Sequence, residues 1–123
     1  MIRIPKQFEI YQANLESRKG SEQGGSRPCL ILQTNGPSAV AKTFLIAPLT
    51  TKNLEYIRAY QVFIPKSRQN GLSSDSKVKL DQLRVIDRSR LLKKLGELEH
   101  NYEPSVFQAI DVMIDRFGDF RSG

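Results

Sequence analysis

The chain has 123 residues and a formal net charge of +6 at pH 7, with 19 Lys+Arg against 13 Asp+Glu. This length favours one small hydrophobic core and excludes a large multidomain enzyme. The chain has one cysteine, Cys29, and one histidine, His100. A single chain therefore cannot form a disulfide framework or a cysteine zinc site, and catalysis by a histidine pair or a serine triad is unsupported. The lone cysteine, together with the lack of an apolar run near the ~20 residues of a membrane helix, predicts a cytoplasmic protein with no membrane segment and no signal peptide.

The charge is distributed unevenly along the chain. Residues 1–96 contain 17 Lys+Arg and 7 Asp+Glu, a net charge of +10, whereas residues 97–123 contain 2 and 6, a net charge of −4. A basic body is typical of proteins that bind nucleic acid. Lysines that serve only solubility and an acidic solvent face of a helix would give the same totals, so charge alone leaves the partner open.

Short strand patterns dominate the first half of the chain. Residues 8–14 alternate apolar and polar side chains, as a half-buried strand does. Residues 15–27 hold three glycines and almost nothing apolar, which indicates a loop. The apolar runs 28–34 and 43–49 are typical of fully buried strands, and Asn-Gly-Pro-Ser at 35–38 breaks the chain between them.

The strand patterns continue as far as residue 98. Residues 58–64 alternate and stop at Pro65, residues 78–87 form one strand or two strands with a bend, and residues 93–98 form a last strand. About six strands at these spacings indicate a small barrel or sandwich.

The C-terminal segment has the period of a helix instead. An apolar stripe recurs at helical spacing through Val106, Phe107, Ile110, Met113, Ile114 and Phe117. Pro104 suits a first helical turn and Gly118 a C-terminal cap, which predicts a helix over about 104–117. We expect this helix to pack on the core and to turn an acidic face outward.

Three segments carry polar groups that could do chemistry: residues 20–28, 47–51 and 80–84. The glycines of the first segment suggest a phosphate cradle, but neither the Walker spacing nor GxGxxG is present. Pro28 restricts Arg27 to extended geometry where a strand begins. Taken singly, each segment also has an ordinary structural explanation. The first is typical of a surface loop, the second of a hydroxyl that stabilises a turn, and the third of a strand whose polar side chains hydrogen-bond to loops.

Taken together, the segments resemble the MazF/PemK family of toxin ribonucleases from bacterial toxin–antitoxin systems. The resemblance covers almost the whole chain and rests on Gly-Ser-Glu-Gln-Gly-Gly-Ser-Arg-Pro at 20–28, Ile-Ala-Pro-Leu-Thr at 46–50, Leu-Asp-Gln-Leu-Arg-Val-Ile-Asp at 80–87, Ser-Arg-Leu at 89–91 and the C-terminal helix. It implies one domain over residues 1–123 with a mainly β fold: a small twisted antiparallel barrel of the CcdB/PemK-like type with a C-terminal amphipathic helix, working as a homodimer.

The resemblance also implies an activity. The family cuts single-stranded RNA at short motifs without a metal or cofactor, leaving a 2′,3′-cyclic phosphate and a 5′-hydroxyl. It makes Arg27 and Thr50 the expected catalytic pair and places Glu22 and Gln82 near the active groove. Because a guanidinium is a poor proton acceptor, our hypothesis for the general base is Glu22.

Substrate contacts are expected along the same groove. Basic side chains there would attract the RNA backbone, and unpaired bases would be recognised by stacking and edge contacts. The expected contacts are Arg18, Lys19, Ser21, Gln23, Thr51, Arg58, Lys77, Lys79, Asp81, Gln82 and Arg84. Tyr56 and Tyr60 either stack on bases or belong to the core. We expect the loops 35–42, 51–57 and 66–76 to select the RNA motif.

Two other functions remain possible on the same fold. One is a basic module that binds RNA or an acidic protein without cutting. The other is a gyrase poison, although poisons of the CcdB type act through a tryptophan-bearing C-terminus and this chain has no tryptophan. The toxin interpretation also predicts a small MazE-like antitoxin whose acidic, disordered segment covers the basic groove.

Overall fold

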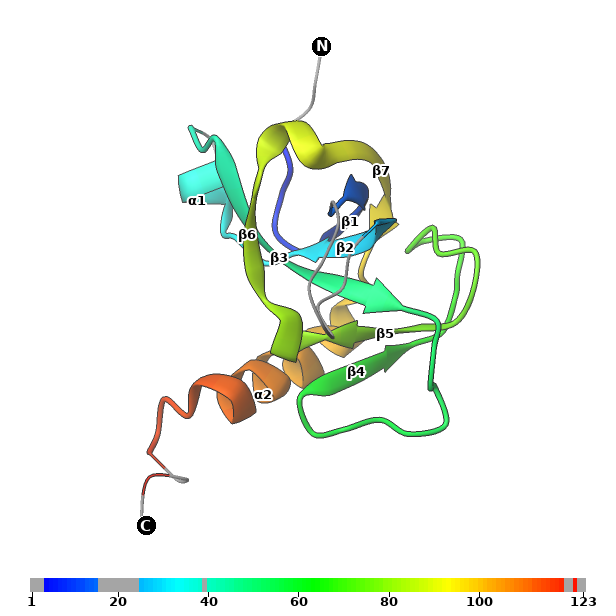
Figure 1. Ribbon diagram of the computed structural model, residues 1–123, viewed down its shortest axis with the longest axis vertical. Coiled ribbons are helices and arrows are strands. Elements are labelled where there is room, and N and C mark those ends of the chain that lie inside the picture. The colour runs from blue at the N-terminus through cyan, green and yellow to red at the C-terminus, as the bar shows by residue number, and fades with distance from the viewer. Residues whose placement is uncertain (1–3, 16–24, 39, 119–120, 122–123) are drawn as a thin grey trace.

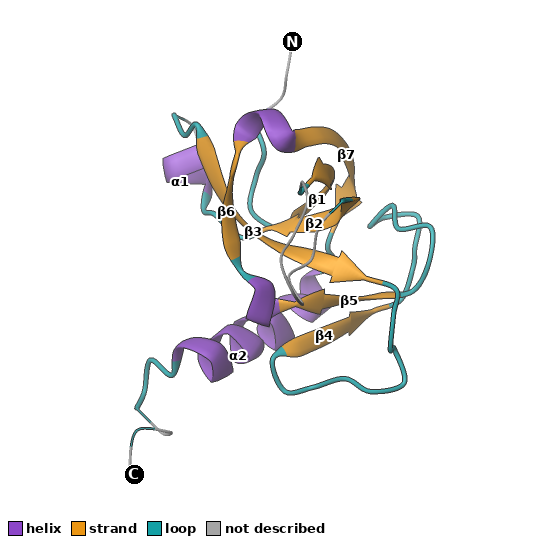
Figure 2. Cartoon of the chain, in the orientation of Figure 1, coloured by secondary structure: helices purple, strands orange, loops and turns teal. Residues whose placement is uncertain are grey.

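The computed structural model describes residues 4–15, 25–38, 40–118 and 121, which form one antiparallel sheet with a helix at the C-terminal end (Figure 1, Figure 2). The strands are β1 (Glu9–Asn14), β2 (Ser26–Ile31), β3 (Thr43–Thr50), β4 (Gln61–Ile64), β5 (Ser76–Lys79), β6 (Arg84–Asp87) and β7 (Leu91–Glu97). The helices are α1 (Asn35–Ser38) and α2 (Glu103–Ile114), with short 3₁₀ turns η1 (Leu80–Gln82), η2 (Arg88–Arg90) and η3 (His100–Tyr102).

Strand β3 is the branch point of the sheet. The order is β4-β5-β3-β2-β1-β7, and every ladder between described strands is antiparallel. Along the edge of β3 away from β2, residues 43–46 pair with β6 and residues 49–50 pair with β5. The sheet curls strongly (Figure 1), but no ladder in the described part joins β7 to β6 or β4. The predicted antiparallel β fold with a C-terminal helix is confirmed, and residues 78–87 are two strands with η1 as the bend.

The central strands are buried on both faces, as their continuous apolar runs predict. On one face Leu30, Ala47 and Leu49 pack in a cluster that also contains Val106 and Ala109 of α2. The other face carries a second cluster: Tyr11, Ala13, Leu15, Cys29, Ile31, Phe44, Ile46 and Ile86. Successive residues of β2 and β3 therefore alternate between two cores.

Helix α2 packs on the sheet through only part of its predicted stripe. Val106 is buried and Ile110 is half-buried against the core, whereas Phe107, Met113 and Ile114 are exposed. The helix also ends at Ile114 rather than at residue 117. Its C-terminal residue is followed by Asp115 in the left-handed region (φ 54°), so the predicted cap at Gly118 is wrong.

The loop of residues 65–75, which joins β4 to β5, folds back onto β7. The Glu97 N–H donates to the Gln69 carbonyl at 2.9 Å. A Cβ added to Gly71 would lie 2.0 Å from the Leu95 carbonyl oxygen, and one added to Gly96 would lie 2.3 Å from the Gln69 carbonyl oxygen. Only glycine allows the two backbones to approach this closely.

Candidate functional site

A polar row crosses the sheet where the second apolar cluster ends. The β2–β3 ladder pairs Cys29 with Pro48, and the same register continued by two residues puts Arg27 opposite Thr50. On the other edge of β3, Thr50 is paired with Lys77 of β5. Residues that face one another in an antiparallel ladder project on the same side of the sheet. Thr50 and Lys77 therefore project on the same side of the sheet, and Arg27 lies on the next strand, two residues beyond the last β2–β3 pair.

The row leads into a pocket of about 470 Å³, which we call the polar pocket. Its walls come from the end of β3, the β3–β4 loop (residues 51–60), β4, β5 and η1, and they are Thr50, Lys52, Asn53, Glu55, Tyr56, Arg58, Tyr60, Gln61, Lys77, Lys79 and Asp81. Four of these side chains are cationic and two are carboxylates, so the pocket favours an anionic ligand. The pocket brings together five residues expected to act on or bind substrate: Thr50, Arg58, Lys77, Lys79 and Asp81.

Thr50 lies at the end of the buried strand β3 and brings an aliphatic hydroxyl group to the polar pocket. Its side chain is 7% exposed, and Oγ1 accepts a hydrogen bond from the Lys52 N–H at 3.2 Å. That bond uses the oxygen as an acceptor, and the hydroxyl proton remains able to donate. Thr50 can therefore give a hydrogen bond to an anionic group held in the pocket.

Lys77 lies deeper than an RNA-contacting cation would. Its side chain is 5% exposed, and Nζ donates to the backbone carbonyls of Asn53 at 2.9 Å and Tyr56 at 3.0 Å. Burial, followed by the nearby charge of Lys79, lowers the pKa of Lys77 below its usual value. The expectation that Lys77 reaches the RNA backbone is therefore replaced by a contact within the protein.

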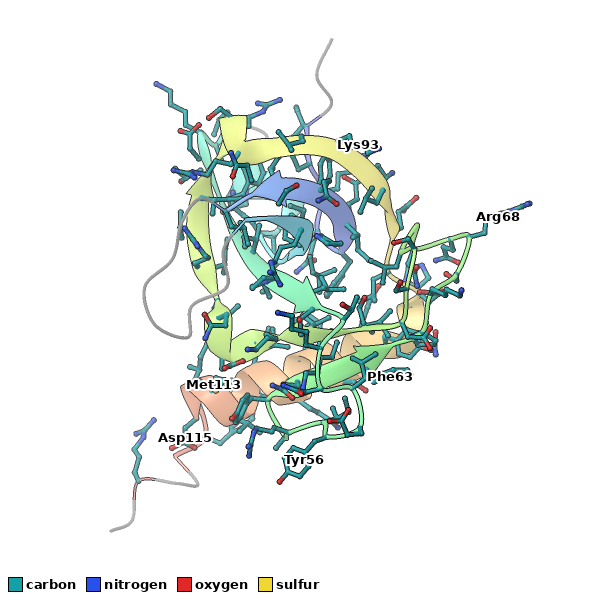
Figure 3. The ribbon with its side chains drawn as sticks, turned by 45° about the vertical axis from the view of Figure 1, so that its right-hand side comes forward. Tyr56, Phe63, Arg68, Lys93, Met113 and Asp115 are labelled. Atoms are coloured by element: carbon teal, nitrogen blue, oxygen red, sulfur yellow. The ribbon has the colours of Figure 1, made fainter. Side chains whose placement is uncertain are left out.

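Asp81 and the Tyr56–Arg58 pair give the polar pocket its remaining recognition groups. Within the described residues, Oδ1 of Asp81 is buried and has no hydrogen-bond partner, so it is an acceptor suited to a donor on a ligand. The guanidinium of Arg58 lies 4.7 Å from the centre of the Tyr56 ring. Tyr56 is 60% exposed and points outward from the loop (Figure 3).

The other expected site residues lie around this pocket or outside the described part. Arg27, Gln82 and Arg84 are half-buried on β2, η1 and β6, and Thr51 is exposed at the start of the loop. None of these four lines the polar pocket. The remaining predictions concern residues outside the described part of the chain: Arg18, Lys19, Ser21, Glu22 and Gln23.

Several pocket residues were not singled out from the sequence: Lys52, Asn53, Glu55 and Gln61. The sequence did indicate the part of the pocket wall that β5 forms, because Lys77 and Lys79 alternate there with Val78 and Leu80. Period two puts both lysines on the face away from the core. Nothing in the pattern indicates that the β3–β4 loop would cover them.

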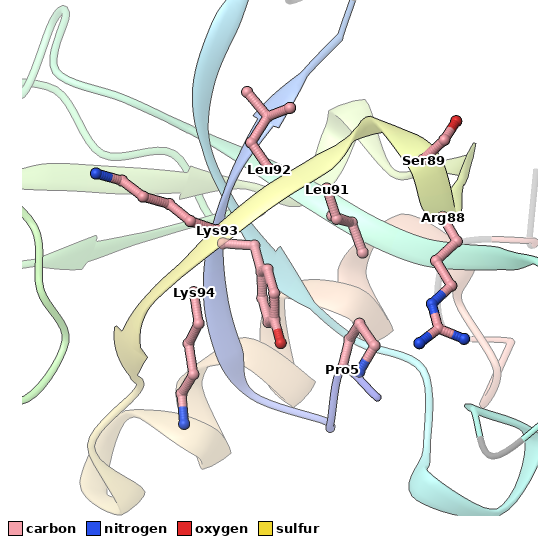
Figure 4. A pocket seen from close by; sticks show the side chains of 8 residues that line it. Pro5, Arg88, Ser89, Leu91, Leu92, Lys93 and Lys94 are labelled. Atoms are coloured by element: carbon pink, nitrogen blue, oxygen red, sulfur yellow. The ribbon is translucent and has the colours of Figure 1, made fainter. Parts of the chain in front are cut away.

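A second hollow, of about 580 Å³, lies by β7 and η2 at the far end of the sheet (Figure 4). Its lining is Pro5, Tyr11, Arg88, Ser89, Leu91, Leu92, Lys93 and Lys94. Leu91 points from β7 toward Pro5 (Figure 4). No expected site residue lines this hollow, so the polar pocket is the candidate active site.

The described residues contain no group of three or more His, Cys, Asp or Glu side chains that could hold a metal ion. None of the helices in that part of the chain is long and apolar enough to cross a membrane.

Comparison with known proteins agrees with the fold and with the motifs. Residues 6–114 match the family described as PemK-like, MazF-like toxin of type II toxin-antitoxin system. The chain is 34% identical over 106 residues to an endoribonuclease MazF of Staphylococcus saprophyticus. The aligned region covers 86% of this chain and 88% of that protein.

Two solved structures from Deinococcus radiodurans share the architecture. A crystal structure of MazF superposes with a TM-score of 0.77 at 25% identity and covers 93% of this chain and 99% of that chain. A MazE–MazF crystal structure gives a TM-score of 0.73 at 25% identity over 94% and 99% of the two chains. Because the family match spans far more than half of the sequence, this chain belongs to the PemK-like, MazF-like toxins of type II toxin–antitoxin systems.

Proposed function

We propose that this chain is an endoribonuclease that cleaves single-stranded RNA as the toxin of a toxin–antitoxin pair. The observation that carries the proposal is the cationic pocket at the end of β3, which Thr50 lines, with Arg27 on the neighbouring strand β2. The two residues come from motifs 23 positions apart in the sequence, and both were expected to act on the phosphate. The relative from S. saprophyticus carries the name endoribonuclease.

The reaction we propose is an in-line transesterification. The ribose 2′-oxygen forms a bond to phosphorus while the bond from phosphorus to the 5′-oxygen breaks, giving a 2′,3′-cyclic phosphate and a 5′-hydroxyl. The planar guanidinium of Arg27 would hold the phosphoryl oxygens as negative charge develops. The Thr50 hydroxyl would donate a further hydrogen bond.

Proton transfer completes the balance of the reaction. The proton of the 2′-hydroxyl goes to a general base, and the leaving 5′-oxygen takes a proton from solvent water. Glu22 is our hypothesis for the base. Full cleavage of a fluorescent RNA oligonucleotide by Glu22→Gln, with cleavage lost in Arg27→Ala, would overturn that assignment. Since arginine, threonine and a carboxylate supply these roles, we propose that cleavage needs no metal or cofactor.

The partners we propose follow from charge and exposed apolar area. The net positive polar pocket would bind the acidic segment of a MazE-like antitoxin, which co-purification from cells expressing both proteins tests. The exposed side chains Met113, Ile114 and Phe117 would form part of a homodimer interface. We place the protein in the cytoplasm, where RNA is translated and where a lone buried thiol such as Cys29 stays reduced.

Incubation of the purified protein with a long RNA in EDTA separates this function from its alternatives. Cleavage at short motifs supports the nuclease. RNA binding without cleavage supports a non-catalytic module, and inhibition of DNA gyrase supports a gyrase poison. Either of the last two results, without cleavage, contradicts the proposal.

A further inference from the structure

The buried ammonium of Lys77 ties the β3–β4 loop to the sheet. Lys77 lies in β5 between Thr50 and Phe63 in the ladders, and its Nζ reaches up to the carbonyls of Asn53 and Tyr56. An ammonium has three N–H donors, and two of them are used by these carbonyls. Hydrogen bonds from a charged donor are about twice as strong as neutral ones.

The tie closes a turn that makes few other hydrogen bonds; just beyond it, the Arg58 N–H donates to Oε1 of Gln61 at 3.0 Å. The Tyr56 N–H donates to the Asn53 carbonyl at 3.3 Å, and Asn53 is in the left-handed region (φ 55°). No residue from 51 to 60 is buried, so apolar packing contributes little to the shape of the loop. Within the described residues, Lys77 is the one buried side chain that donates hydrogen bonds to the carbonyls of this turn.

The turn presents an aromatic ring at the rim of the polar pocket. Tyr56 is exposed and carries the Arg58 guanidinium near its ring. Tyrosine rings and arginine planes are the groups on which proteins stack unpaired bases. The orientation of the ring depends on the backbone at residue 56, whose carbonyl is one of the two that Lys77 binds.

We propose that Lys77 is a positioning residue that fixes the 53–56 turn and thereby holds Tyr56 and Arg58 as a stacking surface for one unpaired base of the substrate. This inference rests on the proposed function, because the base belongs to the RNA that is cleaved. It assigns Lys77 to recognition of one nucleotide rather than to the phosphate backbone.

The first experiment measures the turn without using nuclease activity. Hydrogen–deuterium exchange is followed in peptides that cover residues 51–60 of wild-type protein, Lys77→Met, Lys77→Arg and Lys79→Met. Methionine keeps the length of the lysine stem and removes the donors, so we expect faster exchange in this loop for Lys77→Met. Lys77→Arg, which retains donors, should restore slow exchange. Lys79→Met is the matched control, because Lys79 lies on the same face of β5 and, in the described part of the chain, makes no hydrogen bond to the loop.

The second experiment measures recognition. A randomised single-stranded RNA pool is cleaved and sequenced with each variant and with Tyr56→Ala. We expect Lys77→Met and Tyr56→Ala to lose roughly tenfold in preference at the same motif position, with KM raised and kcat little changed. Lys79→Met should weaken binding by the same factor for every motif and leave the base preference at each motif position unchanged.

The outcomes separate this inference from the proposed function. If wild-type protein neither cuts nor binds the RNA pool, the proposed function fails and the stacking role fails with it. If wild-type protein cuts at a motif but Lys77→Met keeps both the slow exchange of the loop and the same motif preference, only the role of Lys77 is overturned. Thermal unfolding of each variant confirms that the comparison is made between folded proteins.

Discussion

Replacement of Asn70 by alanine should remove the polar centre of the loop at residues 65–75. The side chain of Asn70 is fully buried, and its Oδ1 accepts hydrogen bonds from the N–H groups of Ser67 at 3.1 Å and Leu72 at 3.0 Å. Its Nδ2 donates to the Pro65 carbonyl at 3.0 Å and to Oε1 of Glu99 at 3.2 Å. Asn70→Ala leaves all four of these groups without their partner.

The size of the effect follows from burial. A buried polar group that loses its partner costs about 1–3 kcal/mol. Ser67 and Glu99 are half-buried and can take water in place of the amide, whereas Leu72 is buried and cannot. We therefore expect Asn70→Ala to lower the free energy of unfolding by about 3 kcal/mol. For a domain of this size, that loss lowers Tm by about 10–15 °C.

Urea unfolding followed by circular dichroism, at one fixed protein concentration, measures the loss. The exposed Asn101, on the 3₁₀ turn η3, provides the control, because Asn101→Ala should change stability by less than about 0.5 kcal/mol. If Asn70→Ala costs less than about 1 kcal/mol, the reasoning that Asn70 organises this loop is refuted.

Three further predictions concern the site, acid stability and the close backbone approach. Thr50→Val keeps the shape of the side chain and removes the hydroxyl, so kcat for RNA cleavage should fall by about 10²-fold or more while the protein stays folded; unchanged kcat in single-turnover assays contradicts a role for the hydroxyl. Burial would raise the pKa of Glu99, but hydrogen bonds from Ser67, the backbone and Asn70 outweigh it and lower that pKa. Glu99 therefore stabilises the fold above its usual pKa of 4.5, and this contribution is lost as the pH falls through the lower folded value; the unfolding free energy of Glu99→Gln should fall less steeply below pH 4.5, and equal slopes would refute the assignment. Gly96→Ala would press a methyl group against Gln69, so we expect a loss of about 3 kcal/mol or more in urea unfolding; a loss below about 1 kcal/mol would show that the two backbones separate easily.

Local patterns account for most of the strands. The apolar runs at 28–34 and 43–49 became β2 and β3 because these central strands are covered on both faces. The alternation at 58–64 became β4, in which Val62 and Ile64 are buried and Gln61 lines the polar pocket. The break in 78–87 was also readable, since residues 80–82 interrupt the alternation.

The C-terminal helix shows where periodicity stops being informative. The spacing of apolar residues identified a helix, but it did not distinguish Val106, which is buried, from Ile114, which is 61% exposed. Only the position of α2 on the sheet decides which apolar positions have a partner within the chain. The end of the helix was misplaced because Asp115, whose type only occasionally adopts left-handed geometry, does so here.

The sequence motifs predicted which residues belong to the candidate site, but not how those residues are arranged in space. Arg27 and Thr50 could be named from their sequence context, but their neighbourhood depends on the β2–β3 register, which a single sequence does not specify. Lys77 was expected to contact the RNA backbone because basic side chains along a groove attract phosphates. Its burial follows from the β3–β4 loop, whose path depends on long-range contacts.

The chemical ends of the cleavage products test whether Arg27 and Thr50 cut RNA beside the polar pocket. A single-stranded RNA is incubated in EDTA with wild-type protein and with Arg27→Ala, and the fragment ends are identified by mass spectrometry. We expect 2′,3′-cyclic phosphate and 5′-hydroxyl ends from the wild-type protein, and a rate lower by about 10²–10³-fold for Arg27→Ala. Ends of another type, or equal rates for the two proteins, would contradict this expectation.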